Sequence, residues 1–254
     1  MKPWIKSLRL PTCLLSGFLT LLSFRLARIE LSYLAAFTVA VIAVATMVWN
    51  DWRDKVHDTK KGRRLAHDRP KQFLFFSLML WAFALTLTIM LFREEFRFGI
   101  LALCMVVVGM LYSEMRLIPV IPTLFVSVTA ASSTLFPLLV GDSGRMRNWL
   151  LFAAVAIFIF GREILKDLDD HSIDRGYKWT FPVKIGVRIS RVLVVQLWLT
   201  SIMIGALINP LSLAGIPLLI AADFYLLVKG DHFKTKMLLD LGAAAATIAL
   251  FFVG

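Results

Sequence analysis

Residues 31–58 read LSYLAAFTVAVIAVATMVWNDWRDKVHD, an apolar run that ends in three aspartates. Residues 31–49 carry no charge, and a helix needs about 20 predominantly apolar residues to cross a bilayer. Asp51, Asp54 and Asp58 then follow at spacings of three and four, so they share one face wherever the helix continues. The stretch predicts a membrane-spanning helix that presents three carboxylates at the membrane surface.

The whole chain has the composition of an integral membrane protein. Of its 254 residues, 59% are hydrophobic and 18% are charged, against about 25% charged in an average soluble domain. The mean hydropathy is +0.77. This composition excludes an ordinary water-soluble domain and a disordered chain. The two cysteines, Cys13 and Cys104, lie in apolar runs, which excludes a disulfide framework and a CxxC metal site.

Nine apolar stretches are predicted to be transmembrane helices. They cover residues 11–24, 31–49, 72–92, 98–113, 120–140, 148–165, 192–208, 212–228 and 237–253. The first resembles a signal peptide because Lys2, Lys6 and Arg9 precede it, but no clear small-residue cleavage site follows. We therefore expect an all-α polytopic membrane protein whose residues 1–254 form a single domain.

The distribution of basic residues predicts the orientation of the chain in the membrane. With nine spans, the N-terminal side carries 22 of the 28 Lys and Arg residues. By the positive-inside rule, the N-terminus and the long basic loops 50–71 and 166–191 are cytoplasmic, and we expect the protein to lie in the cell membrane. The net charge of +11 does not indicate nucleic-acid binding, because the basic residues lie between apolar stretches.

The aspartate pattern Dx2Dx3D occurs twice. Asp51, Asp54 and Asp58 form a first trio, and Asp167, Asp170 and Asp174 form a second trio at an offset of 116 residues. Four predicted spans separate the two loops, so both trios open on the same side of the membrane. The repeat predicts two similar four-helix halves followed by a ninth helix.

The two trios indicate a metal site. Each follows the C-terminal end of a span, where the helix dipole disfavours negative charge by about 0.3–1 kcal/mol per group, and the like charges also repel. A single acid beside a span is most simply a solvated polar rim. Two matched trios instead favour Mg²⁺, which takes one or two carboxylates and completes its shell with water and phosphate oxygens. We expect Asp169 to face elsewhere.

Basic residues flank both trios. Besides Arg162 and Lys166, they are Lys60, Lys61, Arg63, Arg64, Arg69, Arg175 and Lys178. We expect most of the basic residues to serve topology and to contact anionic lipid headgroups. Arg162 and Lys166 differ, because they share the i, i+4 row of one helix with Asp170. We expect both to point toward the metal-binding face and to hold diphosphate oxygens.

Two further acids fall inside predicted spans, where carboxylates are costly and usually face a cavity or a partner. Asp223 and Asp240 either bind or deprotonate an acceptor, or they pair with lysines near the interface. Pairing with Lys229, Lys234 or Lys236 is favoured for Asp240. The four histidines show no metal-ligand spacing and are expected at the interface, namely His57, His67, His171 and His232.

These motifs resemble those of the UbiA superfamily of intramembrane prenyltransferases. Residues 50–58 are similar to its NDxxDxxxD motif, and residues 162–174 with Thr180, Pro182 and Gly186 are similar to its second motif region. Weaker similarities are Arg9-Leu10-Pro11, Arg69-Pro70, and Tyr112-Ser113 with Arg116. The resemblance implies a helical bundle with a central cavity open to the lipid, in which Mg²⁺ held by both motifs binds a polyprenyl diphosphate.

The expected activity is transfer of a prenyl group from an isoprenyl diphosphate to a hydroxyl or aromatic-ring acceptor, in lipid or quinone biosynthesis. The six aspartates of the trios are the expected catalytic and metal-binding residues. The expected substrate-binding residues are Asn50, Arg64, Arg69, Tyr112, Arg116, Arg162, Lys166 and Asp223. A terpene cyclase that ionises the same diphosphate without an acceptor is an alternative. A cation-coupled transporter is less favoured, because transporter sites lie near the bilayer midplane.

Overall fold

The structure, a computed structural model, describes residues 8–60, 64–112, 114, 118, 120–141, 144–174 and 179–253. These ranges are helical and contain no strand. The chain divides into two compact units. Unit 1 comprises Met1–Leu21 and Glu30–Met115, and unit 2 comprises Leu22–Ile29 and Arg116–Gly254.

Six helical segments are long and apolar enough to cross a membrane. They are α3 (Tyr33–Arg53), α6 (Pro70–Glu94), α9 (Arg145–Asp174), α11 (Val187–Ile208), the segment Pro210–Lys229 and α13 (His232–Val253). Three shorter apolar helices lie at the other expected positions, namely α2 (Leu10–Leu26), α7 (Phe96–Leu111) and α8 (Ile121–Ser132). The all-α membrane class is therefore confirmed, whereas nine membrane crossings remain a prediction.

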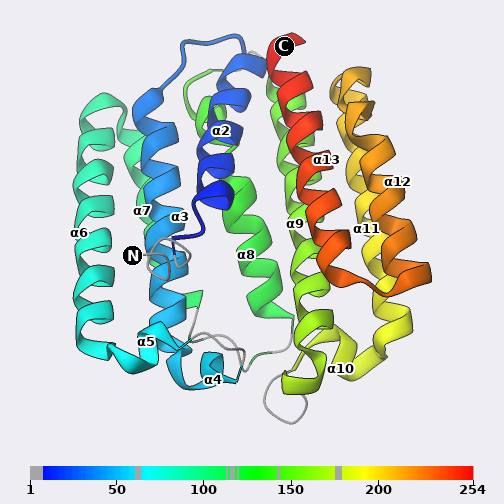
Figure 1. Ribbon diagram of the computed structural model, residues 1–254. Helices are drawn as coiled ribbons and strands as arrows, with labels where there is room; N and C mark the ends of the chain where they lie inside the picture. The colour runs from blue at the N-terminus through cyan, green and yellow to red at the C-terminus, as the bar shows by residue number, and fades with distance from the viewer. Residues whose placement is uncertain are drawn as a thin grey trace. The chain divides into compact units, whose positions relative to one another are not determined.

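Unit 1 is built on α3, which packs against α6 and α7, while α6 also packs against α7 (Figure 1). The hydroxyl of Ser32 caps the start of α3 by accepting the N–H of Ala35 at 3.1 Å. Phe73 and Trp81 of α6 are almost fully buried in this packing. Phe75 on the same helix is 67% exposed. Exposed large apolar side chains of this kind recur along the long helices and indicate a lipid-facing surface.

Unit 2 is centred on α9, which packs against α8, α11 and α13. Helix α13 also packs against η3 (Pro210–Gly215) and α12 (Ile216–Phe224). Figure 1 shows α9, α11, α12 and α13 grouped side by side. The buried core between these helices is apolar and consists of Ile164, Leu165, Leu168, Val194, Trp198, Leu219, Ala222, Leu226 and Leu239.

The stretch expected to form one continuous helix at 120–140 is interrupted. Helix α8 ends at Ser132, and a 3-10 turn, η2 (Phe136–Leu139), follows after a short break. The hydroxyls of Ser133 and Thr134 donate to the backbone carbonyls of Ala130 and Ala131 at 2.7 and 2.8 Å. Pro137 then occupies the first turn of η2, and a proline cannot supply the N–H that a continuing helix needs.

Short helices connect the long ones near both aspartate trios. In unit 1, α4 (Lys55–Thr59) and α5 (Leu65–Asp68) lie between α3 and α6. In unit 2, α10 (Phe181–Ile185) lies between α9 and α11, and the π-helix η4 (Tyr225–Lys229) follows α12. Helix α9 has 30 residues and is about 45 Å long, which exceeds the roughly 30 Å hydrocarbon core of a bilayer.

Candidate functional site

The first trio lies where α3 passes into α4. Helix α3 ends at Arg53, and Asp54 is at once the C-cap of α3 and the N-cap of α4. The N–H of Asp54 donates to the carbonyl of Asn50 at 2.9 Å, and the N–H of Asp58 donates to the carbonyl of Asp54 at 2.8 Å. These bonds keep an almost helical path across the junction, so the residues of the trio stay within two consecutive turns. Asp51 and Asp58 are buried and Asp54 is half-buried.

Arg9 is the cationic partner of Asp51. Its Nη2 atom lies 2.5 Å from Oδ1 of Asp51, and its Nη1 atom lies 3.2 Å from the sulfur of Met47. Arg9 adopts a positive φ of 47°, a conformation that is uncommon for a residue other than glycine. The sequence singled out Arg9 only as a weak similarity before the first span. The sequence feature that could have indicated a role for Arg9 is its place directly before Leu10-Pro11, where the first predicted span begins.

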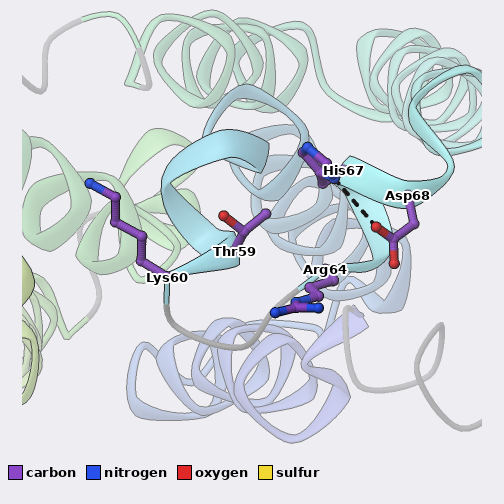
Figure 2. Close-up of a pocket in the computed structure, with 5 residues that line it drawn as sticks. All are labelled: Thr59, Lys60, Arg64, His67 and Asp68. Atoms are coloured by element: carbon purple, nitrogen blue, oxygen red, sulfur yellow. Dashed lines mark hydrogen bonds and ion pairs between the residues drawn. The ribbon is translucent and has the colours of Figure 1, made fainter.

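A pocket of about 440 Å³ lies between α4 and α5. Thr59, Lys60, Arg64, His67 and Asp68 line it (Figure 2). His67 Nδ1 and Asp68 Oδ1 are 3.3 Å apart, as the dashed line in Figure 2 marks. Apart from half-buried Thr59, the lining side chains are exposed, and three of the five are basic. Arg64, predicted to bind substrate, thus lines a polar hollow with Lys60 and Asp68, one short helix away from the first trio.

Three further predicted substrate-binding residues of unit 1 lie at helix ends. Asn50 is half-buried in the last turn of α3, and Tyr112 is half-buried at the C-cap of α7. Arg69 is exposed and forms the N-cap of α6. Arg116 lies outside the described residues, as do Lys61 and Arg63.

The second trio lies in the last turns of α9, which stays helical through Asp174. Asp167, Asp170 and Asp174 therefore share one face of a single helix, as the spacing predicts. Asp174 is fully buried, and Asp167 and Asp170 are half-buried. Asp169 is exposed and bonds with His232 of α13 at 2.8 Å, so it does face away from the trio.

Two buried polar atoms near the second trio have no hydrogen-bond partner among the described residues. They are Nδ1 of His171 and Oγ1 of Thr180. Thr180 is the N-cap of α10, and the φ of +88° at Gly186 lets the chain turn from α10 into α11. Buried polar groups are nearly always hydrogen-bonded, so both atoms are expected to have a partner outside the described residues or a water. The sequence placed Thr180 only within the second motif and gave His171 no role.

Arg162 has a partner that the sequence did not predict. Its Nε and Nη2 atoms lie 2.9 and 3.2 Å from the two carboxylate oxygens of Asp240 on α13. The sequence analysis predicted a lysine as the partner of Asp240, and it predicted that Arg162 faces the second trio. Lys166 lies 3.0 Å from Oε2 of Glu163 on its own helix. Arg162 and Lys166 therefore carry acidic partners within unit 2 and remain only predicted ligands of a diphosphate.

Asp223 lies in α12, directly before the helix widens into the π-helix η4. Its Oδ1 atom is buried and has no hydrogen-bond partner among the described residues. Its predicted role in binding an acceptor remains a prediction. Of the histidines, His57 is buried and His67 is exposed, while half-buried His232 bonds to an aspartate.

The donor atoms of both trios fit Mg²⁺ in kind, since all are carboxylate oxygens. Within the described part of the chain, however, no three metal-ligating side chains gather into one cluster. Mg²⁺ commonly uses one or two carboxylates and takes its other ligands from water and substrate phosphates. The residues present thus fit, in kind, a metal that takes part of its ligand shell from water and a phosphorylated substrate.

Comparisons with known proteins agree with these motifs. The profile of the UbiA prenyltransferase family matches residues 10–251. No curated protein matches the chain in sequence. The solved structure of a UbiA homologue from Aeropyrum pernix K1 is 14% identical, with a TM-score of 0.75 over 94% of this chain and 98% of that one. A structure of digeranylgeranylglyceryl phosphate synthase is 20% identical, with a TM-score of 0.66 over 99% of this chain and 97% of that one.

At these identities the two structures establish the fold alone. The family match covers most of the chain, including both aspartate motifs. On that ground, the chain belongs to the UbiA prenyltransferase family.

Proposed function

We propose that the protein is a Mg²⁺-dependent intramembrane prenyltransferase that moves a polyprenyl group from an isoprenyl diphosphate to an acceptor and releases diphosphate. The observation that carries the proposal is the occurrence of two equally spaced aspartate trios at corresponding helix ends, each with a buried terminal carboxylate, Asp58 and Asp174. Buried carboxylates are retained only where charge or hydrogen bonds compensate them. A cation shared with a diphosphate would add to the interactions that both carboxylates already make within the protein.

The two trios are proposed to act on one substrate headgroup. The helix bounds support an internal repeat, because α6 shifted by 116 residues falls within two residues of the bounds of α11, and α3 shifted by the same number falls inside the longer α9. Two four-helix halves and a ninth helix would give a bundle of nine crossings around a central cavity. The six aspartates would then be the metal-binding and catalytic residues.

Different residues of the chain would bind the phosphate oxygens, orient the headgroup and hold the prenyl tail. Arg64, Arg69, Arg116 and Lys166 would bind phosphate oxygens, and Arg162 would do so through the N–H groups that Asp240 leaves available. Asn50 and Tyr112 would orient the headgroup. Mg²⁺, when bound, would supply charge that stabilises the diphosphate as a leaving group. Apolar helix faces would hold the prenyl tail and exclude water from the carbocation.

The acceptor is proposed to be a hydroxyl or an electron-rich ring of a lipid or quinone precursor. Asp223 supports this, because its buried and unsatisfied oxygen atom is suited to accept a hydrogen bond from an acceptor hydroxyl. The structural neighbour that synthesises a glyceryl phosphate lipid favours the lipid branch. A terpene cyclase remains the second candidate, and a cyclic hydrocarbon formed without any acceptor would favour it.

The test is turnover of labelled geranylgeranyl diphosphate with an acceptor panel in lipid nanodiscs, read by mass spectrometry. Asp54→Asn and Asp170→Asn each remove a charge without removing bulk, so each should lower turnover by about a thousandfold while the protein stays folded. Asp68→Asn is the matched control, because Asp68 is exposed beside the first trio and pairs with His67. Its turnover should stay within about twofold of the wild-type rate.

The double variant tests whether both trios serve one headgroup. Residues that act as a unit are strongly non-additive, so the double variant should be about as slow as either single variant. Near-normal turnover in both single variants would refute the metal role. Fully multiplicative losses in the double variant would instead argue against a shared substrate.

A further inference from the structure

Two pairs of polar side chains join α9 to α13 within unit 2. Arg162 of α9 binds Asp240 of α13 through hydrogen bonds of 2.9 and 3.2 Å. Seven residues further along α9, Oδ1 of Asp169 lies 2.8 Å from Nδ1 of His232, the first residue of α13. The two pairs therefore fix the register of the two helices over the stretch of α9 that leads into the second trio.

The bond between Asp169 and His232 lies where the apolar core of unit 2 ends along α9. Leu168 is the last residue of α9 in that core. Two members of the trio, Asp170 and Asp174, come after it. A helix end moves more easily where fewer apolar contacts hold it. The hydrogen bond of Asp169 therefore holds α9 at the point where the apolar packing stops.

Arg191 of α11 fixes the imidazole ring of His232 from the other side. Nη2 of Arg191 lies 3.4 Å from Nε2 of His232, and an arginine can only donate, so Nε2 is the acceptor. Nδ1 then carries the proton and donates it to Asp169. A Cβ on Gly230 would lie 3.0 Å from Nη2 of Arg191, so the guanidinium rests over this glycine. The ring thus joins α9, α11 and α13 in a single tautomer.

The backbone that carries His232 is also fixed. Oδ1 of Asp231 accepts the N–H of Lys234 at 3.0 Å, which caps the first turn of α13. The hydroxyl of fully buried Thr235 donates to the carbonyl of Asp231 at 2.7 Å. His232 therefore projects from a turn with little freedom to move, as a residue that orients another group requires.

We propose that His232 is a positioning residue for the second trio, a role that rests on the proposed function. By holding Asp169 through Nδ1, it keeps the last turns of α9, and with them Asp170 and Asp174, in a fixed orientation for Mg²⁺ and diphosphate. Side chains that orient metal ligands in this indirect way commonly contribute about ten- to a hundredfold to metal affinity.

The test compares two substitutions that each preserve one half of the imidazole. In His232→Asn, the amide nitrogen takes the place of Nδ1 and keeps the bond to Asp169. In His232→Gln, the longer amide takes the place of Nε2, so it keeps the contact with Arg191 and loses the bond to Asp169. Both variants retain the Asp169 carboxylate, so a loss of affinity reports orientation and not charge. Calorimetry on the full-length protein in nanodiscs measures the affinity for inorganic diphosphate with Mg²⁺.

His232→Gln should weaken diphosphate binding by about tenfold, whereas His232→Asn should stay within about twofold of the wild type. Lys234→Gln is the matched control, because Lys234 lies two residues further along α13 and has Asp231 as its partner. It should bind like the wild type. Hydrogen exchange of the amides of residues 168–174 gives a readout that needs no ligand. Exchange there should be about tenfold faster in His232→Gln and unchanged in the control.

Asp169→Ala provides a second variant, because the side chain of Asp169 is 42% exposed and its removal should leave the protein folded. It should weaken diphosphate binding at least as much as His232→Gln. The double variant should bind no more weakly than Asp169→Ala alone, since both changes break the same bond. A further loss in the double variant would show that His232 acts by another route, and it would overturn the proposal.

The outcomes separate this role from the proposed function. Wild-type diphosphate affinity in His232→Gln would refute the positioning role alone. Faster exchange with unchanged affinity would also refute it and would mark His232 as a structural residue of α13. Equal losses of affinity in His232→Asn and His232→Gln would exclude the bond to Asp169 as the cause. A wild-type protein that binds no diphosphate in the presence of Mg²⁺ would instead refute the metal role in the proposed function.

Discussion

The bond between Arg9 and Asp51 stabilises a buried carboxylate in the first trio. The side chain of Asp51 is 11% exposed and that of Arg9 is 24% exposed. Removing one partner of such a pair leaves a charge that is desolvated and uncompensated. The pair therefore contributes to stability before any substrate binds.

Arg9→Met should lower the free energy of unfolding by about 1–3 kcal/mol, because Asp51 then loses its charge-assisted hydrogen bond. The control is Arg53→Met. Arg53 pairs with Glu114, and both of those side chains are substantially exposed, so that loss should stay below about 1 kcal/mol. Thermal unfolding in nanodiscs measures both variants. An equal loss of unfolding free energy in the two variants would show that the burial of Asp51 does not strengthen its ion pair with Arg9.

At the scale of elements, the turn between α10 and α11 depends on Gly186. Its φ of +88° and ψ of 154° lie in a region that side chains with a Cβ rarely adopt. A Cβ added there would meet nothing within 4 Å, so the strain is in the backbone alone. This turn ends α10, which begins at the Thr180 cap and packs against both α9 and α11.

Gly186→Ala should destabilise the protein by about 1–3 kcal/mol because the backbone conformation is strained for alanine. Gly141→Ala is the matched control, since Gly141 also has open space around it but no positive φ. That substitution should be neutral or slightly stabilising, because alanine restricts the unfolded chain. Denaturation midpoints of both variants provide the measurement. An unchanged midpoint in Gly186→Ala would refute the strain.

Much of the helical organisation follows from the sequence, because hydropathy and charge act locally. The apolar runs at 31–49 and 72–92 become α3 and α6, and the spacing of the second trio correctly predicts one shared face on α9. The break after Ser132 was not predicted, since it depends on hydroxyl-to-carbonyl bonds and Pro137 within an apolar run. The partner of Arg162 was also missed, because the register between α9 and α13 is set by packing.

For the whole molecule, the distribution of basic residues is the basis of the proposed orientation. In a variant whose native cysteines are replaced, a cysteine at Lys60 should react with a membrane-impermeant maleimide only after the cells are permeabilised. A cysteine at Met146, which is 73% exposed at the start of α9, should react in intact cells. This follows because the loop after α3 is strongly basic and the opposite loops are not. The reverse labelling pattern would refute the cytoplasmic placement of the trios.

The length of α9 links the enzyme to the thickness of its host membrane. A helix about 45 Å long in a hydrocarbon layer of about 30 Å must tilt or project, and its charged last turns are suited to project into water. Longer acyl chains would draw these turns toward the hydrocarbon and reduce the hydration of their carboxylates. Hydrophobic mismatch thus makes acyl-chain length a determinant of how the second trio is solvated.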